Sequence, residues 1–179
     1  MKQNIGLKLI NYYSINFGLP ERNKKLIKFI IIHYTGMKKE SRALKKLCDP
    51  NSKVSAHYFI KNNGEIINLV PDAYEAWHAG KSRWNNHISL NKNSIGIEIH
   101  NPGHSHFYKN FSPKQLKSLR LLLKKLIKKY KINLKNILGH SDIAPERKKD
   151  PGEKFPWKKL ARLNLAIWHK ISETNLKKN

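Results

Sequence analysis

The chain has 179 residues, of which 39% are hydrophobic and 27% charged, and this composition fits one globular domain rather than a disordered segment. Its formal net charge of +24 raises the question of a nucleic-acid or membrane-surface partner. However, only six of the 36 basic residues are arginine, and lysine lacks the planar fork that recognises phosphate or guanine through two hydrogen bonds. We therefore expect a solvated basic surface and no specific nucleic-acid partner.

The cysteine content and the N-terminal sequence limit where in the cell the protein is expected. The single cysteine, Cys48, excludes an internal disulfide framework and a cysteine-based zinc finger. The start of the chain lacks the apolar core of a secretory signal, and no segment approaches the roughly 18 apolar residues that span a bilayer. We expect a cytoplasmic monomer without a transmembrane segment; an envelope location stays open if the start is truncated.

The first half of the chain predicts three main strands. Residues 1–23 are polar and are interpreted as an N-terminal arm that lies over the domain. Residues 26–35 are apolar on both faces, as in a strand that is buried on both sides. Asn63-Gly64 separates two apolar runs, 54–60 and 65–70, and predicts an antiparallel hairpin. In residues 94–100, isoleucines alternate with smaller or polar side chains, which predicts a further strand.

The second half predicts helices around one short strand. Ser112, Pro113 and Gln115 form the start of a helix with a capping box, and its apolar side chains up to Tyr130 share one face. This basic amphipathic helix is interpreted as a cover for the core; membrane or partner binding is the less favoured alternative. A short strand at 136–139 and a last helix at 157–171 follow. The pattern predicts an α/β class with a mixed sheet in one domain, 24–171, followed by a basic tail, 172–179.

Three side chains in the pattern suit a catalytic metal. His33 and His140 both stand at the carboxyl ends of predicted strands, where open α/β sheets place their sites. Asp150 precedes Pro151, which holds the preceding residue extended and so aims its carboxylate. Two imidazoles and one carboxylate with an open fourth position describe a catalytic zinc site, with one Zn²⁺ ion. Taken singly, each histidine is more often a structural residue.

A zinc hydrolase also needs a proton acceptor and a group that stabilises an oxyanion. Glu98 is the candidate base, because it lies on the strand face opposite the isoleucines; an exposed face of an edge strand is the alternative. Lys148 is the candidate oxyanion partner, but from spacing alone Lys149, Arg147 or plain solvation compete evenly with it.

Five motifs follow one another in a familiar order: IIHYT at 31–35, VSAHYFI at 54–60, GEIINLVPDAYEAWHAGKSRW at 64–84, NSIGIEIHNPG at 93–103 and GHSDIAPERKKDPG at 139–152. Together they resemble the zinc-dependent N-acetylmuramoyl-L-alanine amidases of the type 2 amidase superfamily, which includes peptidoglycan-recognition proteins, over residues 26–165. The resemblance implies zinc ligands at His33, His140 and Asp150, a catalytic glutamate at Glu98 and a catalytic lysine at Lys148. It implies hydrolysis of the amide between N-acetylmuramic acid and L-alanine in peptidoglycan or anhydromuropeptides.

The remaining motif residues predict a substrate cleft with less support, since core packing or surface roles explain them equally well. These candidate substrate-binding residues are Tyr34, His57, Trp77, His78, Arg83 and Asn101. Four further histidines, at 87, 104, 106 and 169, belong to no motif and are interpreted as surface residues. The segment NNHISLNK, 85–92, departs from the family's pattern, and one interpretation is that it borders the sugar site. The choice between intact peptidoglycan and recycled fragments stays open.

Two rival functions stay under consideration. One is a non-catalytic domain of the same fold that binds peptidoglycan; loss of a zinc ligand would mark it, and none is lost. The other is a basic, metal-dependent nucleic-acid-binding protein, for which steep salt dependence on DNA would be diagnostic. Attraction of the positive charge to anionic cell-wall material or lipid is compatible with the amidase.

Overall fold

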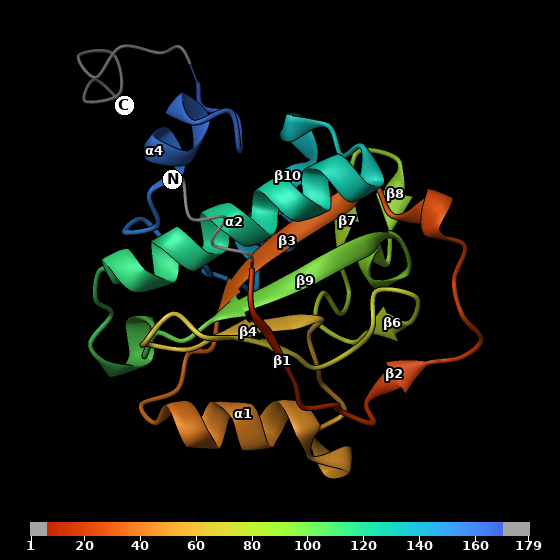
Figure 1. The fold of residues 1–179 in the computed structure, drawn as a ribbon, viewed down its shortest axis with the longest axis horizontal. Helices are drawn as coiled ribbons and strands as arrows, with labels where there is room; N and C mark the ends of the chain where they lie inside the picture. Colours follow the sequence, from red (N-terminus) through yellow and green to blue (C-terminus); the bar gives the residue numbers. More distant parts are fainter. Residues whose placement is uncertain (1–6, 170–179) are drawn as a thin grey trace, which may run out of the picture.

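The computed structural model describes residues 7–169 and shows a mixed sheet between helices (Figure 1). In the described part of the chain, the main sheet has six strands in the order β1-β5-β4-β9-β3-β10. These strands are β1 (Leu9–Asn11), β3 (Phe29–Tyr34), β4 (Tyr58–Ile60), β5 (Ile66–Asn68), β9 (Ser94–Ile99) and β10 (Ile137–Gly139). Two small ribbons pair β2 (Phe17–Gly18) with β6 (Glu75–Ala76) and β7 (Arg83–Trp84) with β8 (His87–Ile88).

The centre of the sheet is parallel, because β3 pairs in parallel with β9 and β10, and β9 pairs in parallel with β4. The side chains of β3 are buried on both faces from Phe29 to His33, as the apolar run predicts. Strands β4 and β5 are antiparallel around the Asn63-Gly64 turn, where Gly64 has a left-handed φ of 86°. The predicted mixed sheet and hairpin are both confirmed.

Helices cover the two faces of the sheet. Helix α2 (Pro113–Tyr130) begins with the predicted capping box and packs Leu119, Leu122, Leu123 and Leu126 against the isoleucines of β3 and β9. Helix α1 (Glu40–Cys48) packs Ala43 and Leu47 against Phe59 and Ile67 on the opposite face. The remaining helical segments are α3 (His140–Ile143), α4 (Trp157–Arg162), η1 (Lys24–Leu26), η2 (Pro50–Ser52), η3 (Leu90–Asn93), η4 (His104–His106) and η5 (Leu134–Asn136). None of the helices within residues 7–169 is both long and apolar enough to cross a membrane.

The N-terminal arm contributes to the sheet itself. Within the predicted arm, β1 pairs in parallel with β5 at the sheet edge, and β2 pairs with β6. The side chain of Ser14 donates to the carbonyl of Leu47, and that of Asn16 donates to the carbonyls of Asp49 and Val54. Residues 14–16 of the arm are therefore held by the end of α1 and the segment after it. Its boundary with the predicted domain at residue 24 stays a prediction.

The last helix is shorter than the sequence predicts. It was expected at 157–171, but α4 ends at Arg162, so this prediction is wrong for residues 163–169. Asn164 takes a left-handed φ of 54°, which stops the helix and turns the chain back. As a result, Leu165 and Ala166 pack into the main core cluster. Residues 170–171 and the predicted tail, 172–179, lie outside the described residues.

Candidate active site

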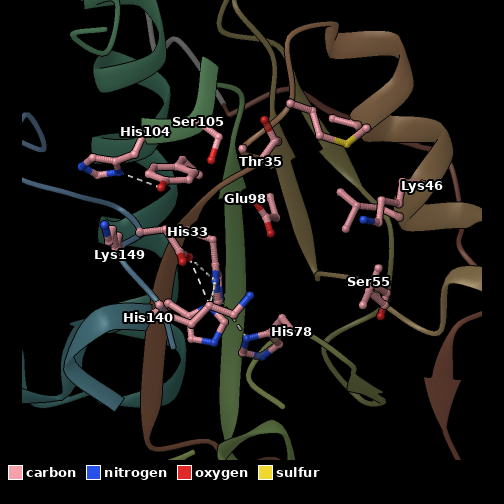
Figure 2. A pocket seen from close by; sticks show the side chains of 18 of the residues that line it. His33, Thr35, Lys46, Ser55, His78, Glu98, His104, Ser105, His140 and Lys149 are labelled. Carbon is pink, nitrogen blue, oxygen red and sulfur yellow. Dashed lines mark hydrogen bonds and ion pairs between the residues drawn. The ribbon is translucent and has the colours of Figure 1, made fainter. Parts of the chain in front are cut away.

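A pocket of about 440 Å³ opens at the carboxyl ends of β3 and β9. Its walls come from β3, α1, the 54–55 and 77–78 segments, Glu98 of β9, the 104–105 turn and the loop at 147–150. Figure 2 shows His33, His140 and His78 meeting on one side of this pocket, with Glu98 beside them and Lys46 on the opposite wall. The pocket therefore lies on the α1 face of the sheet, since Glu98 alternates with the isoleucines that pack against α2.

Three donor atoms converge in this pocket. His33 ends β3, and His140 directly follows β10, whose parallel register with β3 brings the two imidazoles together. The His33 Nδ1 and His140 Nδ1 atoms are 2.9 Å apart, and Asp150 Oδ2 lies 3.0 Å from the first and 3.1 Å from the second. All three side chains are buried. The loop returns Asp150 to this point because its backbone carbonyl accepts a hydrogen bond from the Ser141 N–H.

The donor set fits a single metal ion. Three ligand atoms bound to one ion through bonds of about 2 Å lie within about 4 Å of one another. The three atoms here are 2.9 to 3.1 Å apart. Burial, followed by the charge of neighbouring His140, lowers the pKa of His33 to about 4. Its imidazole is therefore neutral at neutral pH, which is the form that binds metal. The His140 ring is oriented from behind, because its Nε2 lies 3.1 Å from the carbonyl of Ala79.

Glu98 supplies a carboxyl group beside the three donors. It is the register partner of His33 on β9, and its Oε2 atom is buried without a hydrogen-bond partner among the described residues. Burial first, and the charge of Asp150 second, raise the pKa of Glu98 to about 8, against the opposing charges of Lys148 and Lys46. When this carboxyl is ionised, its unpaired oxygen and raised pKa make it a strong proton acceptor inside the pocket.

The structure separates the three cations that the sequence leaves as alternatives. The Arg147 guanidinium donates to the carbonyls of Ala79 and Lys81, at 3.0 Å from Nε to the latter, so it fastens two loops together. Arg147, Lys148 and Lys149 all line the pocket. The charge of Lys148 lowers the pKa of both His33 and Glu98. Of the three cations, Lys148 is therefore the one best placed to act on charge at the site.

The weaker substrate-binding predictions divide into two groups. Tyr34, Trp77 and His78 line the pocket, whereas His57, Arg83 and Asn101 do not. His57 is fully buried behind the pocket, where Nδ1 accepts from the Gly96 N–H. Asn101 is also fully buried, and its amide donates to the carbonyl of Lys109. Arg83 is exposed on the β7–β8 ribbon. The local sequence around His57, Arg83 and Asn101 does not show that they lie outside the pocket, because their positions depend on residues far away in the sequence.

The pocket also contains residues that the sequence reasoning missed. His104 is exposed, as predicted, but it also lines the pocket, and its Nδ1 lies 2.8 Å from the Tyr34 hydroxyl. The other ring nitrogen lies 2.9 Å from the Glu153 carboxylate, which joins this rim to the loop that carries Asp150. Lys46 reaches the pocket from α1. No motif signalled either residue; the position of Lys46 on the pocket side of an amphipathic helix is the one available hint.

Comparison with known proteins identifies the family of this chain. The Amidase_2 family, described as N-acetylmuramoyl-L-alanine amidase, matches residues 22–153. The chain therefore belongs to the Amidase_2 family of N-acetylmuramoyl-L-alanine amidases, which confirms the resemblance carried by the five motifs. The α/β fold with a mixed sheet is also that of the solved amidases below.

Individual relatives cover most of this chain. It is 39% identical over 161 residues to the N-acetylmuramoyl-L-alanine amidase AmiD of Escherichia coli, a match that covers 83% of this chain and 57% of AmiD. It is 37% identical to the 1,6-anhydro-N-acetylmuramyl-L-alanine amidase AmpD of Citrobacter freundii, which covers 66% of this chain and 61% of AmpD. The chain thus spans about three fifths of the length of these relatives.

Solved structures extend the comparison to three dimensions. The complex of E. coli AmiD with anhydro-N-acetylmuramic acid-L-Ala-D-gamma-Glu-L-Lys superposes with a TM-score of 0.75 at 36% identity, over 89% of this chain and 65% of that one. The complex of AMPDH3 from Pseudomonas aeruginosa with anhydromuramic pentapeptide also gives a TM-score of 0.75, at 32% identity, over 94% and 70% of the two chains.

Proposed function

We propose that this chain is a zinc amidase that hydrolyses the bond between the lactyl group of N-acetylmuramic acid and L-alanine. The observation that carries the proposal is the convergence of His33, His140 and Asp150 beside the unpaired carboxyl of Glu98, in a chain of the amidase family. The ligands combine borderline imidazole with a hard carboxylate and include no thiolate, a set that zinc accepts readily. In this proposal the three residues, which all line the pocket, would hold one Zn²⁺ ion.

The residues around the metal divide the remaining chemistry. A bound zinc ion supplies Lewis acidity, which lowers the pKa of water and polarises the substrate carbonyl. In its ionised form Glu98 takes the proton from the attacking water, because its Oε2 atom has no other partner and its raised pKa makes the carboxylate a stronger base. The same proton then goes to the alanine nitrogen as the carbon–nitrogen bond breaks. Lys148 provides positive charge for the oxygen that becomes negative during attack.

Muropeptide fragments are the substrates that we favour. The AmiD and AMPDH3 complexes both hold anhydromuramyl peptides, and this chain superposes on both. Lys46, Lys148 and Lys149 line the pocket and suit the carboxylates of a stem peptide, which both substrates carry. Intact peptidoglycan is the alternative substrate.

The test is mass spectrometry of the products from an anhydromuropeptide and from intact peptidoglycan. The protein is assayed with zinc, after chelation, and as Glu98→Ala, with exposed Glu65→Ala as a matched control. We expect zinc-dependent release of peptides with a free L-alanine amine, which Glu98→Ala loses and Glu65→Ala keeps. The faster substrate identifies the preferred one.

The rival binding function has its own outcome in this assay. Protein that binds peptidoglycan but cleaves neither substrate, with or without zinc, is a recognition domain, and the roles given to Glu98 and Lys148 are then wrong. The monomeric state expected from the sequence stays a prediction.

A further inference from the structure

We propose that His78 is a positioning residue that fixes the tautomer of His33, so that the Nδ1 lone pair of His33 faces the metal. The inference rests on the proposed function, in which His33 binds zinc. It concerns a histidine that the sequence suggests as a substrate contact. The structure supports it through a continuous chain of hydrogen bonds behind the pocket.

The chain of hydrogen bonds links four groups in a line. His33 Nε2 lies 3.0 Å from His78 Nδ1, and His78 Nε2 lies 3.1 Å from Ser94 Oγ. The Ser94 hydroxyl in turn donates to the backbone carbonyl of Leu90 at 2.5 Å. The side chains of His33, His78 and Ser94 are all buried, with exposed fractions of 1%, 8% and 0%. Water does not compete for these groups to any large extent.

The direction of every hydrogen bond in this series follows from its last member, the carbonyl of Leu90. A carbonyl oxygen only accepts, so the one hydroxyl proton of Ser94 is used on Leu90. Ser94 Oγ must then accept the N–H of His78 Nε2. A neutral imidazole with its proton on Nε2 has a lone pair on Nδ1, which must accept from His33 Nε2. His33 is left with its lone pair on Nδ1, the atom beside His140 and Asp150.

The backbone around His78 orients the second imidazole as well. The N–H groups of His78 and Ala79 both donate to Asn91 Oδ1, at 3.1 and 2.7 Å. The carbonyl of Ala79 faces His140 Nε2, which leaves the Nδ1 lone pair of His140 toward the metal position. One turn, residues 78–79, therefore sets both histidines with Nδ1 inward. Asn91 belongs to the divergent 85–92 segment, so part of that segment anchors this turn.

The imidazole of His78 packs directly against the backbone of Gly96 in β9. A Cβ atom at Gly96 would lie 2.4 to 2.7 Å from atoms of the His78 ring, so only glycine there lets the imidazole rest on β9. Both ring nitrogens of His78 already have partners within the protein. Neither is therefore free for the substrate. His78 acts on the reaction through His33.

The first test compares the zinc affinity of the full chain with His78→Asn and His78→Leu, by competition with a chromophoric chelator. The two replacements have similar size and shape, but only asparagine carries an acceptor near the position of Nδ1. We expect His78→Leu to bind zinc about 10- to 100-fold more weakly than wild type, as losses of such outer partners do. His78→Asn should recover most of the affinity. Equal losses in both variants would mean that His78 only fills space, and would overturn the inference.

Ser94→Ala tests the next link without touching His33. The variant removes the acceptor of His78 Nε2–H, so His78 becomes free to move its proton to Nδ1. We expect zinc affinity to fall in this variant too. His100→Asn, which alters another buried histidine of the same region, is the matched control and should leave zinc affinity unchanged. An unchanged zinc affinity in Ser94→Ala would show that the hydrogen bond from His78 to Ser94 does not fix the tautomer of His33, and would overturn the inference.

The second test reads the tautomers directly, by ¹H–¹⁵N correlation spectra of histidine side chains in the metal-free wild-type chain. We expect His33 and His78 both to carry their proton on Nε2. A proton on Nδ1 of His78 would overturn the inference, whether or not zinc binds. If wild-type protein binds no zinc, the proposed function fails instead. Backbone spectra of the His78 variants show whether each remains folded.

Discussion

The fold opposes the ionisation of Glu98. Burial, with the charge of Asp150, raises its pKa to about 8 in the folded chain. In the unfolded chain its pKa is about 4.3. The folded state is therefore destabilised progressively as pH rises above about 4.3, and the full loss of stability is reached above about pH 8. We predict that Glu98→Gln stabilises the metal-free protein on the order of 5 kcal/mol at about pH 9, and has little effect at about pH 4. Urea unfolding in the presence of a chelator measures the difference.

The matched control for this prediction is Glu65, which is exposed and pairs with Lys61. The Glu65→Gln variant should not become more stable relative to wild type as pH rises, because water and Lys61 favour the ionised form of Glu65. Wild type and Glu98→Gln with parallel stability curves from acid to alkaline pH would contradict the prediction. In that event the Glu98 carboxyl ionises as freely as an exposed one.

At the scale of residues, position along a strand was predictable and hydrogen-bond partners were not. His33, Glu98 and His140 were found because strand alternation and strand ends place them on one edge of the sheet. His57 and Asn101 were expected at the cleft, but their partners lie in segments that no local pattern connects. Arg147 and Lys148 could not be separated by spacing, because only the path of the 79–81 loop shows which of them is already engaged.

Helix α2 is held at its end by one buried carboxylate. Asp72 accepts hydrogen bonds from the Tyr58 hydroxyl at 2.7 Å, the Tyr130 hydroxyl at 2.6 Å and Lys129 Nζ at 2.8 Å. Burial by itself would raise the pKa of Asp72, but the hydrogen bonds from Lys129, Tyr130 and Tyr58 outweigh it and lower the pKa. We predict that Asp72→Asn destabilises the protein by about 2–4 kcal/mol at neutral pH. Urea unfolding tests this.

The pH dependence of this second prediction has the opposite sign to that of Glu98. A lowered folded pKa stabilises the protein above the unfolded pKa, and this contribution disappears as pH falls through the folded value. The difference between wild type and Asp72→Asn should therefore be largest at neutral pH and shrink in acid. Tyr130→Phe, which removes one donor and keeps the charge pair, should cost less. Equal stability of wild type and Asp72→Asn at neutral pH would show that the network adds nothing.

At the scale of elements, length decided what could be predicted. The apolar run of β3, the alternation of β9 and the capping box of α2 each extend over enough residues to show their period. Strand β1 has only three residues and lies in a polar segment, so its pairing with β5 depends on the sheet edge rather than on its own pattern. The end of α4 was missed because the backbone of Asn164, an ordinary polar residue, takes a left-handed conformation.

Arg22 joins parts of the molecule that are far apart in sequence. Its guanidinium donates to the carbonyls of Asp72, Asn91 and Ser94, at 3.1, 2.9 and 2.7 Å. Burial lowers the pKa of Arg22 to about 10, against the opposing charge of Asp72, and the side chain stays charged at neutral pH. We predict that Arg22→Met destabilises the protein by about 3 kcal/mol or more, because several buried carbonyls lose their donor. Thermal unfolding measures the loss.

The same change should reach the metal site. Arg22 holds the backbone of Asn91, whose side chain holds the turn at His78 and Ala79. Zinc affinity should therefore fall in Arg22→Met. The stability of Arg22→Lys should lie between that of Arg22→Met and that of wild type. Arg83→Met, on the exposed β7–β8 ribbon, is the control for loss of an arginine and should leave stability unchanged. An Arg22→Met variant as stable as wild type would show that the arm folds independently of these contacts.

The charge of the whole molecule is unevenly distributed. Residues 99–141 contain no aspartate or glutamate but ten lysines and arginines, and helix α2 occupies the centre of this stretch. Helix α2 covers one face of the sheet (Figure 1). The pocket lies on the other face, so the surface of α2 lies away from the proposed chemistry. A field of this kind attracts polyanions without recognising their sequence. It therefore predicts binding without specificity.

We predict that the protein binds unrelated DNA duplexes with equal affinity at low salt. Between about 50 and 200 mM salt the affinity should fall by about a thousandfold or more, because lysine–phosphate contacts release counterions. Fluorescence anisotropy with two labelled duplexes measures both properties. At the higher salt, added DNA should not slow hydrolysis of a small muropeptide, since the two surfaces lie on opposite faces. Binding that survives the salt and prefers one sequence would instead require a built nucleic-acid site, because spread lysine charge produces neither property.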